Sequence, residues 1–115
     1  MNNFKKNIPL EKRKSESNNV MSKYKDRLPI IVQKFNDCKL PDIDKCKFLV
    51  PKDMNMGQFI YIIRKRIKLK PEEALFVIVN NNLVSSSEQI NSVYEKHKDE
   101  DGFLYVIYTS ENTFG

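Results

Sequence analysis

Apolar residues occur along the chain in two patterns, and each pattern predicts a different kind of element. Between residues 55 and 69 they recur at helical spacing and predict one buried stripe, formed by Met56, Phe59, Ile60, Ile63 and Ile67. Short apolar runs predict strands at residues 28–34, 46–51, 74–79 and 103–108. Two further helices are expected at residues 10–23 and 87–98, the second with Ser87 as its N-cap. Pro71 is expected to end the helix at 55–69.

The order of these elements predicts an α+β fold. After an N-terminal helix, the order strand, strand, helix, strand, helix, strand is that of the ubiquitin-like β-grasp. The first and last strands are expected to lie parallel at the centre of the sheet, with the crossover helix covering one face. We therefore expect an N-terminal helical extension at residues 1–24, a β-grasp core at 25–109 and a flexible C-terminal tail at 110–115.

Composition and charge narrow the possible classes of function. The chain has no run of 18 apolar residues and no apolar secretory segment near Met1, which favours a cytoplasmic protein. Residues 1–70 carry 18 Lys and Arg against 7 Asp and Glu, whereas residues 71–115 carry 2 against 8. This asymmetry indicates either a surface that steers charged partners or ordinary solvated helix faces. Nucleic-acid binding is not expected, because no RNA- or DNA-binding motif accompanies the basic half.

The sequence does not indicate an enzyme. Cys38, Cys46 and the single histidine, His97, lack the spacing of a metal site, and the three glycines form no phosphate-binding loop. Neither cysteine has a histidine near it in sequence that would activate it as a nucleophile. We therefore expect no catalytic residues, no metal and no cofactor.

The second strand is apolar on both of its faces. Phe48 and Val50 alternate with Leu49, so neither face is polar, although this strand is expected at an edge of the sheet. An apolar edge strand is either covered by neighbouring elements or used to bind an extended peptide as an added strand. The pattern alone leaves both interpretations open.

The last residue, Gly115, follows a polar run that begins after the final strand. Such an end is either a frayed terminus or an unhindered carboxylate that an enzyme activates. The predicted fold favours the second interpretation, because a central last strand directs the tail out of the core.

Several segments together resemble the autophagy ubiquitin-like modifiers, the group of the GABA-receptor-associated protein and the microtubule-associated light chain. The resemblance covers essentially the whole chain. Its motifs are LEKRKSES (10–17), YKDRLPI (24–30), LPDIDK (40–45), KFLVP (47–51), GQFIYIIRKRI (57–67), YEKHKDEDGFLY (94–105) and ENTFG (111–115).

The resemblance implies that Gly115 is the site of lipid conjugation. In the family, an activating enzyme uses ATP to form an adenylate and then a thioester, and a conjugating enzyme passes the acyl group to phosphatidylethanolamine. A processing cysteine protease exposes the glycine in most members and later removes the lipid. The modifier itself is the substrate of these enzymes and performs no chemistry. It is expected in the cytoplasm and, once conjugated, on autophagosomal or vacuolar membranes, which it coats.

The resemblance also implies partners, namely autophagy receptors and adaptors with a short aromatic-x-x-aliphatic motif. The residues that correspond to the pocket for the aromatic side chain are Glu16, Val20, Pro29, Ile31, Lys47, Leu49 and Phe103. Those for the aliphatic side chain are Phe48, Val50, Pro51, Met54, Phe59, Ile62, Ile63 and Arg66. The backbone of Lys47 and Leu49 is expected to pair with the peptide.

Four basic side chains are expected to suit acidic residues that flank such motifs: Arg27, Lys45, Lys47 and Arg66. The alternative to a lipid-conjugated modifier is an unconjugated peptide-binding or cytoskeleton-associated adaptor of the same fold.

Overall fold

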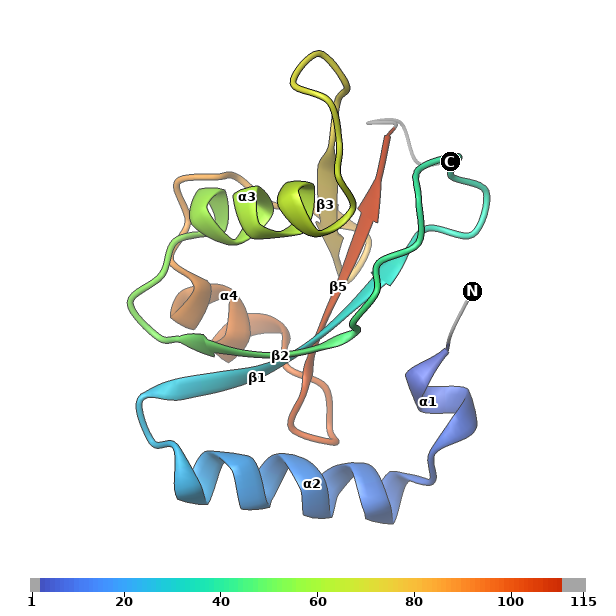
Figure 1. Ribbon diagram of the computed structural model, residues 1–115. Coiled ribbons are helices and arrows are strands. Elements are labelled where there is room, and N and C mark those ends of the chain that lie inside the picture. The colour runs from blue at the N-terminus through green and yellow to red at the C-terminus, as the bar shows by residue number, and fades with distance from the viewer. Residues whose placement is uncertain (1–2, 111–115) are drawn as a thin grey trace.

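A five-stranded mixed sheet with helices on both faces forms the centre of the computed structural model, which describes residues 3–110 (Figure 1). Its elements are α1 (Phe4–Asn7), α2 (Leu10–Lys23), β1 (Arg27–Lys34), β2 (Lys47–Pro51), α3 (Met56–Arg66), β3 (Phe76–Val79), β4 (Asn82–Leu83), α4 (Ile90–His97) and β5 (Leu104–Thr109). None of the helices in this part of the chain is long and apolar enough to cross a membrane.

The strand order is β2-β1-β5-β3-β4. β1 and β5 pair in parallel, from Ile30 opposite Leu104 to Lys34 opposite Tyr108, while β1 pairs with β2 in antiparallel register. The prediction that the first and last strands lie parallel at the centre of the sheet is therefore confirmed. β2 is an edge strand, and β5 carries the chain through the middle of the sheet to Thr109.

The core lies mainly between the sheet and helices α3 and α4, which share one face (Figure 1). α3 contributes Phe59 and Ile63, and α4 contributes Ile90 and Val93, each no more than 1% exposed. A smaller cluster on the other face joins Phe4 of α1 to two buried residues of the sheet region, Ile31 and Phe103. The N-terminal helices therefore cover the face that α3 and α4 leave open.

Helix α3 ends at Arg66, three residues before the predicted end. Lys68 adopts the left-handed conformation with φ 56°. The N–H groups of Lys68 and Leu69 donate to carbonyl oxygens of the last helical turn at 3.2 and 3.0 Å. This pattern is a Schellman motif, which satisfies carbonyls that the helix itself leaves unpaired. The prediction that Pro71 ends the helix is wrong, because the chain has already turned away at Lys68.

Two short elements, α1 and β4, are absent from the elements that the sequence predicts. After β3, Asn80 and Asn81 both have positive φ, 48° and 65°. Two left-handed residues between paired strands make a tight turn of type I′, whose twist matches that of a hairpin. The chain therefore reverses at once and forms β4 against β3, with Asn82 opposite Val79.

Helix α4 begins at Ile90, later than the predicted start at Ser87. Its N-cap is Gln89, whose side chain makes no capping hydrogen bond, so Ser87 is not the cap. Ser87 instead takes part in a local turn, where its N–H donates to the hydroxyl of Ser85 at 3.3 Å.

Candidate functional site

The outer edge of β2 pairs with no other strand among residues 3–110. The carbonyl of Cys46 and the N–H of Lys52 bond to β1 and to the residue just before it, at 2.8 and 3.0 Å. Because backbone groups in an antiparallel pair point alternately toward and away from the partner, those of Lys47 and Leu49 point outward. The guanidinium of Arg27 reaches the carbonyl oxygen of Leu49 at 3.5 Å. The two residues predicted to pair with a peptide therefore face the open edge.

On the α3 side of this edge, the predicted aliphatic-pocket residues gather around Phe48. The Phe48 and Phe59 rings meet edge to face, with centroids 5.7 Å apart. Met54 and Ile62 are half-buried and pack against the same core cluster. Apolar side chains from β2 and α3 thus pack together beside the open edge.

On the α2 side, the predicted aromatic-pocket residues lie between α2 and the sheet. Glu16 of α2 forms an ion pair with Lys47 of β2, whose Nζ donates to Oε2 at 2.7 Å. Leu49 lies opposite Pro29 in the ladder. Ile31 and Phe103 pack with Phe4 of α1, so the short helix borders this part of the site.

The predicted site residues differ in how far they reach the surface. Seven are buried: Pro29, Ile31, Phe48, Val50, Phe59, Ile63 and Phe103. Six are half-buried: Glu16, Val20, Leu49, Pro51, Met54 and Ile62. The four basic side chains are exposed: Arg27, Lys45, Lys47 and Arg66. The apolar residues therefore belong partly to the core. In β2, Phe48 and Val50 are buried, while Leu49 and Pro51 are half-buried beside the unpaired edge.

Two cations border the Phe48 ring, among the residues predicted for the aliphatic pocket. Lys45 Nζ lies 5.2 Å from the ring centroid and the Arg66 guanidinium carbon 5.6 Å from it. Arg66 is also paired with Asp44, whose two carboxylate oxygens lie 3.3 and 3.2 Å from Nη1. The sequence does not single out Asp44, because its contact with Arg66 spans 22 positions.

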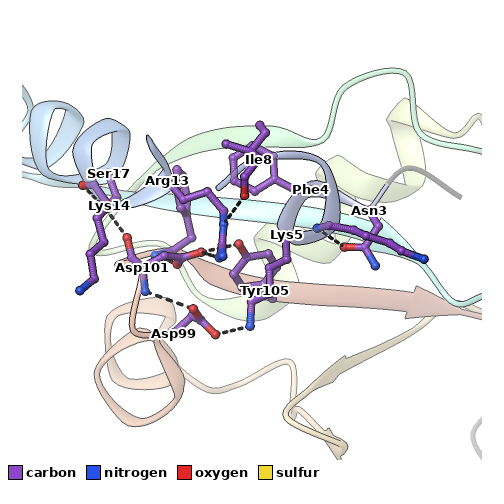
Figure 2. A network of polar contacts seen from close by, with 12 residues as sticks. Asn3, Phe4, Lys5, Ile8, Arg13, Lys14, Ser17, Asp99, Asp101 and Tyr105 are labelled. Carbon is purple, nitrogen blue, oxygen red and sulfur yellow. Dashed lines mark hydrogen bonds and ion pairs between the residues drawn. The ribbon is translucent and has the colours of Figure 1, made fainter. Parts of the chain in front are cut away.

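A buried polar network fastens the N-terminal helices to the turn before β5 (Figure 2). Arg13 Nη1 donates to the fully buried carboxylate of Asp101 at 2.6 Å. The Tyr105 hydroxyl donates to the same carboxylate, and the Ser17 hydroxyl donates to the Asp101 carbonyl oxygen. In α1, Lys5 forms an ion pair with Asp99.

This network shifts the ionisation of its members. Burial and then the hydrogen bond to Asp101 raise the pKa of Tyr105 far above its ordinary value. Burial alone opposes ionisation of Asp99, yet the hydrogen bond from Lys5, with that from the Asp101 N–H, lowers the pKa of Asp99 below its ordinary value. Both shifts favour the protonation states that tie the helices to the turn at neutral pH.

The described residues show no cluster of three or more His, Cys, Asp or Glu that could hold a metal ion. Cys38 and Cys46 are free thiols. Gly115 and the rest of residues 111–115, on which the conjugation prediction falls, lie outside the described residues.

The sheet order, the crossover helix and the two N-terminal helices define a ubiquitin-like α+β protein with a helical extension. Residues 12–115 match the family described as "Autophagy protein Atg8 ubiquitin like". The chain belongs to this Atg8 family of autophagy ubiquitin-like proteins.

Named relatives support this assignment over nearly the full length. The chain is 54% identical to autophagy-related protein 8a of Arabidopsis thaliana over 112 residues, covering 97% of this chain and 92% of the relative. It is 53% identical to autophagy-related protein 8A of Oryza sativa subsp. indica, covering 97% and 94%. The crystal structure of Trypanosoma brucei ATG8 superposes with a TM-score of 0.92 at 44% identity, covering 100% of this chain and 99% of that one.

Proposed function

We propose that this protein is a modifier that is conjugated through Gly115 to phosphatidylethanolamine. Membership of the Atg8 family supports this, as does the course of β5, which runs through the centre of the sheet and ends at Thr109. The remaining residues to Gly115 follow directly from a strand that is anchored on both sides. The proposed partners are the activating and conjugating enzymes, a processing cysteine protease and the lipid.

We expect Gly115→Ala to abolish conjugation, because a methyl group beside the carboxylate hinders its activation and transfer. The measurement is a gel-shift assay with purified activating and conjugating enzymes, ATP and vesicles that contain phosphatidylethanolamine. Retained conjugation of the variant would contradict the proposal. If the unsubstituted protein forms no thioester with the activating enzyme, the alternative of an unconjugated adaptor is favoured instead.

The second half of the proposal is docking of receptor peptides at the β2 edge. The observation that carries it is the outward backbone of Lys47 and Leu49, between apolar side chains of α2 and α3. A peptide that adds as a strand gains main-chain hydrogen bonds there and places alternate side chains on the two flanking surfaces. We expect residence on the autophagosomal membrane to depend on conjugation. Neither the docking edge nor the net charge of +5 provides a stable membrane anchor by itself.

For docking, we expect Leu49→Ala to weaken an aromatic-x-x-aliphatic peptide at least about five-fold, the loss typical of a truncated interface anchor. Isothermal calorimetry measures this directly. Leu83→Ala is the matched control, because Leu83 is 50% exposed on β4 at the opposite edge of the sheet. Equal affinities for the Leu49 variant and the unsubstituted protein would count against this site.

A further inference from the structure

We propose that Asp44 limits the preference of the docking edge for acidic partners, because it competes with them for Arg66. This inference rests on the proposed docking function and names a residue that sets its specificity. Asp44 lies in the loop between β1 and β2, and Arg66 is the last residue of α3.

Arg66 lies between the Asp44 carboxylate and the Phe48 ring of the proposed docking edge. Its Nη1 lies 3.3 and 3.2 Å from the two oxygens of Asp44, while the guanidinium carbon lies 5.6 Å from the centroid of Phe48. Both members of the pair reach solvent, with 37% of the Arg66 side chain and 66% of the Asp44 side chain exposed. A partner can therefore approach Arg66, but the Nη1 of the guanidinium is already paired with Asp44.

An acidic residue of a peptide that reaches Arg66 must displace the Asp44 carboxylate or share the guanidinium with it. Displacement loses an existing ion pair, and sharing brings two like charges together. A neutral peptide side chain meets neither obstacle. Asp44 thus weakens the binding of acidic peptides relative to that of neutral ones. An unfavourable contact with one kind of partner is one way in which an interface gains specificity.

The effect of Asp44 on peptide affinity should be small. Ion pairs between exposed side chains are weak, and the energies measured for them correspond to changes of about 1.4- to 5-fold in an equilibrium constant. Removal of the competing charge should therefore raise the affinity for an acidic peptide by an amount in that range. The affinity for a neutral peptide of the same length should stay the same.

The test uses two synthetic peptides with Trp and Leu at the anchor positions, one with glutamates at the flanking and intervening positions and one with glutamines there. Calorimetry at constant ionic strength gives the ratio of their affinities for each protein. We expect Asp44→Asn to raise the affinity for the glutamate peptide about 1.4- to 5-fold and to leave the affinity for the glutamine peptide unchanged. An unchanged ratio, or weaker binding of the glutamate peptide, would overturn the inference.

Asp42→Asn is the matched control for long-range electrostatics. It removes the same charge from the same loop, but Asp42 is 77% exposed and pairs with Lys34 at 3.1 Å. An equal change in both variants would mean that net charge, not competition for Arg66, sets the ratio. In an Arg66→Ala background, Asp44→Asn should no longer alter the ratio, and a persisting effect would contradict the inference.

These outcomes separate the inference from the function on which it rests. If the unsubstituted protein binds neither peptide, the proposed docking function fails, and the role of Asp44 fails with it. If both peptides bind and their ratio is insensitive to Asp44, only the inference fails.

Discussion

At the scale of single residues, the pair of Arg13 and Asp101 is the contact whose loss should cost most. The Asp101 side chain is 0% exposed and the Arg13 side chain 11% exposed. Removal of one partner leaves a buried charge uncompensated, whereas an exposed pair contributes little. The N-terminal helices therefore depend on this network for their position against the turn before β5.

We expect Arg13→Ala to lower the free energy of unfolding by about 3 kcal/mol, the lower end of the range usual when one partner of a buried ion pair is removed. The loss should be at the lower end because the Tyr105 hydroxyl and the Phe103 N–H still donate to Asp101. Urea denaturation measures this. The control is Lys98→Ala, which breaks the exposed pair with Glu95 and should cost no more than about 1 kcal/mol. Similar losses in the two variants would show that the buried network does not hold the helices.

At the scale of elements, the end of α3 contains a residue in a costly conformation. Lys68 has φ 56°, a region in which a side chain is disfavoured and glycine is not. Lys68→Gly should therefore raise the free energy of unfolding by about 1 kcal/mol. Lys68→Ala should give no comparable gain, because alanine keeps the unfavourable Cβ. The same urea titration compares them, and equal effects would assign the change to the lysine side chain instead.

The long elements of this fold could be predicted from the sequence because each carries its own apolar run or helical stripe. The runs at 28–34 and 103–108 gave β1 and β5, and the stripe from Met56 to Ile67 gave α3. The ends were less accurate, since the conformation of Lys68 and the cap at Gln89 depend on local backbone geometry. α1 and β4 are too short, at four and two residues, to show any period.

The candidate site could be predicted only in part. The apolar edge of β2 was visible as alternation in residues 48–50, but the sequence left open whether neighbours cover it or a peptide uses it. In the structure the face of β2 with Phe48 and Val50 is buried, the face with Leu49 is half-buried, and the outer edge is unpaired among residues 3–110. The contact of Arg13 with Asp101 joins residues 88 positions apart. Phe4, which packs against Phe103, lies in a helix that no sequence pattern indicated. Nothing in the order of residues reports such distant contacts.

At the scale of the whole molecule, the two proposed activities lie on different parts of one domain. The docking edge is β2 at one side of the sheet, while β5 leads toward Gly115 from the centre. Substitutions at the edge are therefore expected to leave conjugation intact, and a substitution at Gly115 to leave docking intact. We propose that the joint result is a receptor-binding surface fixed to a membrane.

The most direct test of this claim is recruitment of a fluorescent aromatic-x-x-aliphatic peptide to vesicles that contain phosphatidylethanolamine. The protein is first incubated with the activating and conjugating enzymes and ATP, and the peptide that sediments with the vesicles is then measured. We predict recruitment by the unsubstituted protein, none by Gly115→Ala despite normal binding in solution, and a clear loss for Leu49→Ala despite normal conjugation. Equal recruitment by the unsubstituted protein and the Gly115 variant would contradict the account.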